Sequence, residues 1–152
     1  MFHKKMILAI IVSSLVLIAG LTLMFSLNQE KTDTQENLAE QQHALETSIA
    51  KWFVNDYEGV EEIEFTGWGH SPETGDWYMR VIVNKDNRMS LSFDNLEGLE
   101  AMSGSVHSPK TFKVIEKPEV EELPAIRYRV KDIEQTSLEG IIVIYSKDYK
   151  GD

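Results

Sequence analysis

Histidine and serine are the residue types in this sequence that could act in metal-dependent or nucleophilic catalysis. The histidines are His3, His43, His70 and His107. No two of them have the short helical spacing of a zinc motif, and no serine lies in a G-x-S-x-G elbow. The chain has no cysteine and no glycine-rich phosphate-binding motif. These absences predict a protein that is not an enzyme, with no catalytic residue, no metal site and no cofactor.

Aromatic residues form a second candidate site, one that would bind rather than catalyse. Trp68 and Tyr78 flank the loop "GHSPETGD", which contains His70. The register that pairs Phe65 with Val81 places Trp68 opposite Tyr78, on the sheet face away from Val81. Exposed aromatic side chains beside a loop can bind a glycan or a protein. Trp68, His70 and Tyr78 are therefore the candidate binding edge, unless the aromatic pair only locks the hairpin or lies under the C-terminal strands.

Charge limits the partners that the chain can have. It holds 15 basic and 25 acidic residues, a formal net charge of −10, which repels nucleic acid. Two acidic clusters stand out, and each could meet a basic protein or cations, or serve only as solvated surface. Their members are Glu58, Glu61, Glu62 and Glu64 in one, and Glu116, Glu119, Glu121 and Glu122 in the other.

The elements that position these side chains follow from the hydrophobic pattern. A helix is predicted over residues 33–58, because one stripe carries Leu38, Leu45, Ile49, Trp52 and Phe53. From Val60 onward the period changes to two, and strands are predicted over 60–68, 77–84, 89–93, 125–130 and 140–145. Pairing Val83 with Met89 continues the apolar face, and the run at 140–145 is typical of a central strand. The sequence predicts an α+β domain in which an amphipathic helix packs on an antiparallel sheet of about five strands.

The first part of the chain indicates a membrane anchor. Met6–Leu27 has 22 residues without a charge, which is long enough to cross a bilayer core. Lys4 and Lys5 precede this run, so the N-terminus is expected in the cytoplasm and the remainder outside the cell. The predicted organisation is a cytoplasmic N-terminus at 1–5, a transmembrane signal-anchor at 6–27, a stalk at 28–37 and an extracytoplasmic α+β domain at 38–152.

A resemblance adds to this description. The run "FVNDYEGVEEIEFTGWGHSPETGDWYMRVIVN", which follows a polar helix and an N-terminal apolar segment, resembles small uncharacterised cell-envelope proteins of Gram-positive bacteria. Such proteins are membrane- or lipid-anchored domains of unknown function, and the likeness implies a place and a fold without implying any catalytic residue. Leu21 stands where a lipidated member would carry cysteine, so lipidation is not expected here.

Two functions remain open at this point. The first is a non-catalytic, membrane-anchored domain that binds a protein outside the cell, as an envelope accessory or an immunity-type factor. The second is a cell-wall glycan binder or weak enzyme that uses the aromatic hairpin edge. The expected partners are the plasma membrane, through residues 6–27, and a protein outside the cell.

Overall fold

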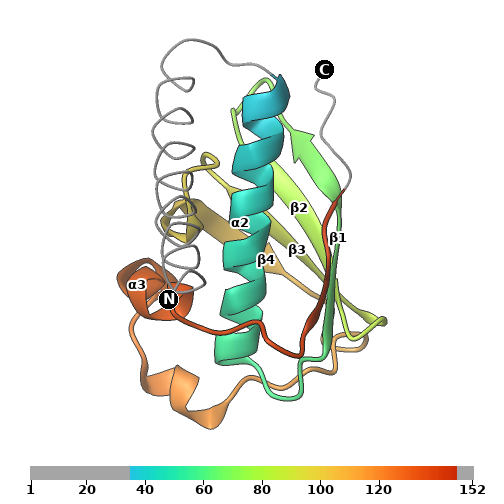
Figure 1. Ribbon diagram of the computed structural model, residues 1–152, viewed down its shortest axis with the longest axis vertical. Coiled ribbons are helices and arrows are strands. Elements are labelled where there is room, and N and C mark those ends of the chain that lie inside the picture. Colours follow the sequence, from blue (N-terminus) through green and yellow to red (C-terminus); the bar gives the residue numbers. More distant parts are fainter. Residues whose placement is uncertain (1–34, 147–152) are drawn as a thin grey trace, which may run out of the picture. The chain divides into compact units, whose positions relative to one another are not determined.

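The computed structural model describes residues 35–146, and the residues from Leu38 onward belong to one compact unit. The main helix and the sheet are α2 (Gln35–Asp56), β1 (Glu62–His70), β2 (Trp77–Val83), β3 (Asn87–Phe93), β4 (Met102–Val106) and β5 (Ile142–Ile144). Short helical segments connect them: η1 (Leu99–Ala101), η2 (Pro118–Glu122), η3 (Ile126–Tyr128) and α3 (Val130–Glu134). Figure 1 shows α2 lying across one face of the sheet. The predicted α+β class is thus confirmed, whereas the predicted transmembrane segment at 6–27 lies outside the described residues.

The sheet has five strands in the order β4-β3-β2-β1-β5. Strands β1 to β4 form an antiparallel meander, in which the connection from β3 to β4 contains η1. β5 reaches the far edge by a long crossover and pairs parallel to β1. The prediction of a wholly antiparallel sheet is therefore wrong at this one strand, and the sheet is mixed.

The core lies between α2 and one face of the sheet. Ile63, Phe65, Val81 and Val83 are 3 % exposed or less, and the helix contributes Phe53 at 0 %. Other members of the same core are Leu45, Ile49, Trp52, Met79, Met89, Leu91, Phe93, Leu99 and Ile133. Burial of this apolar surface is the main term that stabilises the fold.

The predicted pairing of Val83 with Met89 differs from the observed register. Val83 pairs with Asn87, and Met89 pairs with Val81, two residues from the predicted partner. The turn is shorter than expected because Asn84 and Lys85 adopt φ values of 51° and 72°, which lets β3 begin earlier. A shift of two residues keeps the same side chains on the buried face, so the predicted apolar face is confirmed.

The C-terminal third departs furthest from the prediction. Residues 125–130, expected as a strand, form η3 and the start of α3. The fourth strand is instead β4, which the sequence pattern does not predict. The run at 140–145 does contain a strand, but β5 lies at an edge of the sheet and Ile142 is 58 % exposed.

The segment after α3 crosses the outer side of α2 before it reaches β1. Lys51 Nζ donates to the carbonyl of Glu134 at 2.9 Å, and Thr136 Oγ1 donates to Asn55 Oδ1 at 3.3 Å. The red segment in Figure 1 follows this path and then runs beside β1. Helix α2 is thereby held between the sheet and the C-terminal segment, and within residues 35–146 the opposite face of the sheet has no covering layer.

A buried ion pair fixes the start of this crossover. The guanidinium of Arg129 makes two hydrogen bonds to Asp56, from Nη1 to Oδ1 at 3.0 Å and from Nη2 to Oδ2 at 2.9 Å. Trp52 Nε1 donates a further bond to Asp56 Oδ2 at 2.9 Å. The hydrogen bonds from Arg129 to Asp56 raise the pKa of the guanidinium, so it stays charged in its buried position.

Candidate functional site

Trp68 lies on the helix-facing side of the sheet, not on the open side. Its indole Nε1 donates to Glu46 Oε2 at 2.9 Å, and its ring lies 5.7 Å from that of Phe93. The cause is a β-bulge: Phe65 pairs with Val81 as predicted, but Trp68 pairs with Met79. The prediction that Trp68 lies opposite Tyr78 on the outer face is therefore wrong. This tryptophan packs against the core and donates a hydrogen bond to Glu46.

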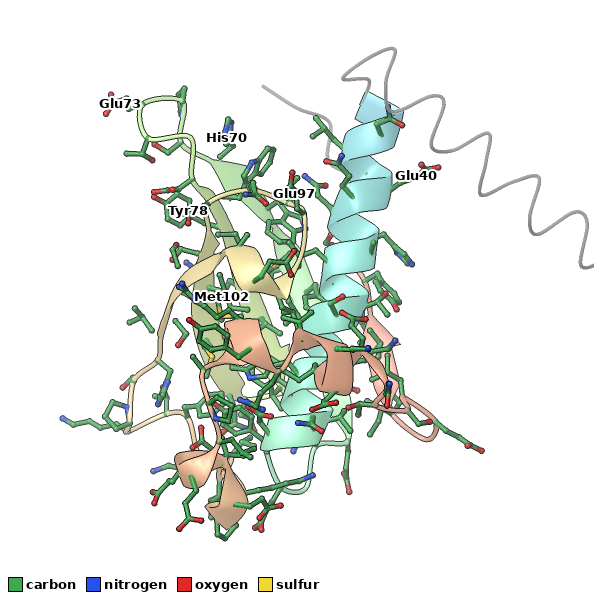
Figure 2. The ribbon with its side chains drawn as sticks, turned by 90° about the vertical axis from the view of Figure 1, so that its left-hand side faces the viewer. Glu40, His70, Glu73, Tyr78, Glu97 and Met102 are labelled. Carbon is green, nitrogen blue, oxygen red and sulfur yellow. The ribbon has the colours of Figure 1, made fainter. Side chains whose placement is uncertain are left out.

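His70 and Tyr78 also separate. The imidazole of His70 stacks on Trp77, with ring centroids 4.2 Å apart, at the end of β1. Tyr78 pairs with Gly69 and is 45 % exposed. In Figure 2, Tyr78 lies on the side of the sheet away from α2. The structure thus leaves Tyr78 alone of the three predicted residues on the open face.

The open face is defined by the outward-pointing residues of the five strands. Its centre is formed by Tyr78 and Arg80 on β2 and by Ser90 and Ser92 on β3, which pair with them directly. Apolar side chains reach solvent at the two edges, with Val106 73 % exposed on β4 and the isoleucines of β5 43–58 % exposed. Of these residues, the tyrosine and the arginine are types that protein-binding surfaces favour.

A shallow hollow of about 510 Å³ lies in this face beside the bulge. Its lining residues are Thr66, Gly67, Trp68, Gly69, Tyr78, Met79, Arg80 and Ser90. Gly67 adopts φ 137°, a conformation that residues with a side chain rarely take, and a Cβ at Gly67 or Gly69 would meet no atom within 4 Å. Because these two glycines have no side chains, the space beside the phenol ring of Tyr78 stays unfilled.

The charge of this face differs from that of the whole chain. Arg80 and Arg88 are exposed, and neither guanidinium has an ion pair or hydrogen bond with another described residue. Glu62 and Glu64 lie on the same face at the β1–β5 side. The face thus has a basic half over β2 and β3 and an acidic half over β1, on a chain whose net charge is −10.

Two other buried polar groups, Glu46 and Tyr57, act within the fold. Glu46 is 1 % exposed and accepts hydrogen bonds from the indole of Trp68 and from both the N–H and the Oγ of Ser146, at 2.6–2.9 Å. Its carboxylate thereby joins α2 to β1 and to the end of the β5 segment.

Burial, followed by the nearby carboxylates of Glu116 and Asp56, raises the pKa of Tyr57 to about 12. The phenol therefore stays neutral in the core.

The described acidic and histidine side chains do not gather into a metal site. No group of three or more His, Asp or Glu side chains within 35–146 is arranged to hold a metal ion. The backbones of the two acidic clusters approach each other. Tyr57 and Glu116 form an isolated antiparallel β-bridge, and the N–H of Glu58 donates to the carbonyl of Ile115 at 2.8 Å. These contacts lie near the end of α2, whereas Glu62 and Glu64 extend the first cluster along β1 on the open face.

Sequence reasoning missed Arg80, Ser90 and Gly69 as members of a common surface. The alternation of β2 and β3 already placed Arg80 and Ser90 on the outward side, so this signal was available. The hollow was not predictable in the same way, because it depends on the bulge at Gly67 and on the uncovered side of the sheet.

The chain matches no protein-family model, and neither a curated protein nor a solved structure is significantly similar to it.

Proposed function

We propose that this protein is a membrane-anchored, non-catalytic binding domain that meets a protein partner outside the cell through the open face of its sheet. The observation that carries this proposal is the exposed pair Tyr78 and Arg80 beside an open hollow, on a sheet face that no described element covers. Tyrosine and arginine, like tryptophan, are enriched among the residues that contribute most binding energy at protein interfaces. An envelope accessory or an immunity-type factor would present such a surface.

The location rests on the sequence. Met6–Leu27 is uncharged and long enough for a bilayer, and basic residues precede it. Within residues 35–146, no helix has the length and hydropathy required to cross a membrane. The anchor that we propose is therefore the segment at 6–27, with a cytoplasmic N-terminus and an outward-facing domain.

Affinity capture of the tagged full-length protein from membranes tests the proposal with a matched control. Tyr78→Ala combined with Arg80→Ala should lose the captured partner. Arg127→Ala combined with Tyr128→Ala removes the same two residue types from η3, where both side chains are exposed, and should retain it. Equal recovery by both variants would reject the open face as the binding site.

A glycan is the second candidate ligand, because a phenol ring beside Thr66, Arg80 and Ser90 also fits a sugar. The same variants separate the two cases when they are incubated with purified wall glycan. Retention of wall glycan by the native protein and loss by the Tyr78 and Arg80 variant, with no captured protein, would favour the glycan.

A further inference from the structure

β4 forms one edge of the sheet, and β3 is its only partner among the described strands. An edge strand directs alternate N–H and C=O groups outward, where another strand can pair with them. Within residues 35–146, no segment makes a backbone hydrogen bond to the outer side of β4. This edge is therefore open to an added strand.

The composition of β4 does not protect this edge, although the strand is short and has a bulge. Natural edge strands are often blunted by lysine, by proline, by an inward charge, by a short length or by a bulge. β4 reads Met-Ser-Gly-Ser-Val, without a charge or a proline, and Val106 is 73 % exposed. A register shift leaves Ser103 as an extra residue, so regular pairing with β3 is limited to Gly104, Ser105 and Val106. An added segment must therefore be short.

The charge around this edge indicates the kind of segment that fits. The sequence contains no acidic residue between Ala101 and Ile115, while Lys110 and Lys113 lie just after β4. Arg88 lies on the neighbouring strand β3, and none of these three exposed cations has an ion pair within the described part of the chain. The other end of β4 is acidic, because Glu100 precedes the strand and Asp94 bonds to Ala101. The three cations therefore form a local basic zone at the Val106 end of β4, which attracts carboxylates on a chain with net charge −10.

We propose that β4 is a strand-addition site for a short, extended, acidic segment of a protein partner. The proposal rests on the proposed function, since it states how the partner would reach the open face. The opposite edge is less suitable, because β5 lies beside Glu62 and Glu64, which repel an acidic strand. A second copy of this chain is also a poor occupant, because each copy carries a charge of −10 and pairing would place the two basic zones together.

Hydrogen exchange measured by mass spectrometry on the full-length protein in detergent tests the proposal. The probes are two synthetic hexapeptides, one alternating glutamate with valine and one alternating lysine with valine. The acidic peptide should slow exchange in Met102–Val106, and the basic peptide should not. Arg88→Glu combined with Lys110→Glu should weaken binding of the acidic peptide by about tenfold or more. Arg127→Glu combined with Lys131→Glu, exposed on η3 and α3, should leave it unchanged.

Three results would overturn strand addition. They are equal slowing by both peptides, slowing that does not include residues 102–106, and outer amides of β4 that are already protected in the free protein. If the Tyr78 and Arg80 variant loses its partner while the acidic peptide leaves β4 unaffected, strand addition is wrong and the proposed function stands. If that variant retains its partner, the proposed function is wrong whatever β4 does.

Discussion

Removing one member of the buried Asp56–Arg129 pair should destabilise the fold severely. Asp56 is 2 % exposed and Arg129 is 8 % exposed, so neither charge can be solvated when its partner is lost. Asp56→Ala leaves the guanidinium and the indole N–H of Trp52 without their acceptor. Breaking a buried pair in this way costs about 3–5 kcal/mol. Since a small domain has about 5–15 kcal/mol of stability, the variant should unfold at a much lower denaturant concentration.

A double-mutant cycle isolates the contribution of the pair. Arg129→Met should also cost about 3 kcal/mol, because it leaves the carboxylate of Asp56 uncompensated. The double variant removes both charges, so its cost should fall below the sum of the two single costs by about 2 kcal/mol. Urea unfolding followed by tryptophan fluorescence measures all three free energies. Additive costs, or a single variant that loses less than about 1 kcal/mol, would refute the role assigned to the pair.

The remaining predictions concern the core, the bulge and alkaline pH. Phe65→Ala should cost about 3–5 kcal/mol, and Trp68→Ala more than about 2 kcal/mol, because both side chains pack on the helix-facing side; a neutral Trp68 variant in urea unfolding would contradict the observed bulge. Gly67→Ala should lower the thermal midpoint, because it adds about 1–3 kcal/mol of backbone strain. Gly69→Ala is the control and should not lower it. Equal thermal midpoints for the two variants would contradict the strain assigned to position 67. The pKa of Tyr57, raised to about 12 from 10.0, means that the folded state holds its phenol proton more tightly than the unfolded chain does. The contribution of this phenol to the free energy of unfolding is therefore fully present below pH 10.0, and up to about 2–3 kcal/mol of it is lost by pH 12. Tyr57→Phe should remove this loss, which urea midpoints measured across that pH range would show.

The helix and the first three strands could be predicted because their signals are local. The stripe from Leu45 to Phe53 and the alternation around Phe65 and Val81 each decide a buried face without reference to the rest of the chain. The bulge could not be read in the same way. Gly67 allows φ 137°, but the sequence alone does not say that one extra residue is inserted there. That residue moved Trp68 to the other face and divided the predicted binding edge.

The C-terminal elements depend on tertiary contacts. Residues 126, 128 and 130 alternate as in a strand, yet the ion pair of Arg129 and the burial of Ile133 favour η3 and α3. β4 has weak strand propensity, since Ser-Gly-Ser forms its centre, and it exists because β3 offers a partner. The apolar run that contains Ile142 predicted a strand but not its edge position, because the crossover over α2 is not encoded in a local pattern.

Photo-crosslinking in intact cells tests the binding surface most directly. A photoreactive phenylalanine analogue is placed at Tyr78 on the open face or, as the control, at Tyr128, which is 76 % exposed on η3. The full-length protein is then irradiated and recovered. We expect one discrete crosslinked protein from position 78 and none from position 128. A crosslinked protein from position 128 with none from position 78 would contradict the assignment of the open face.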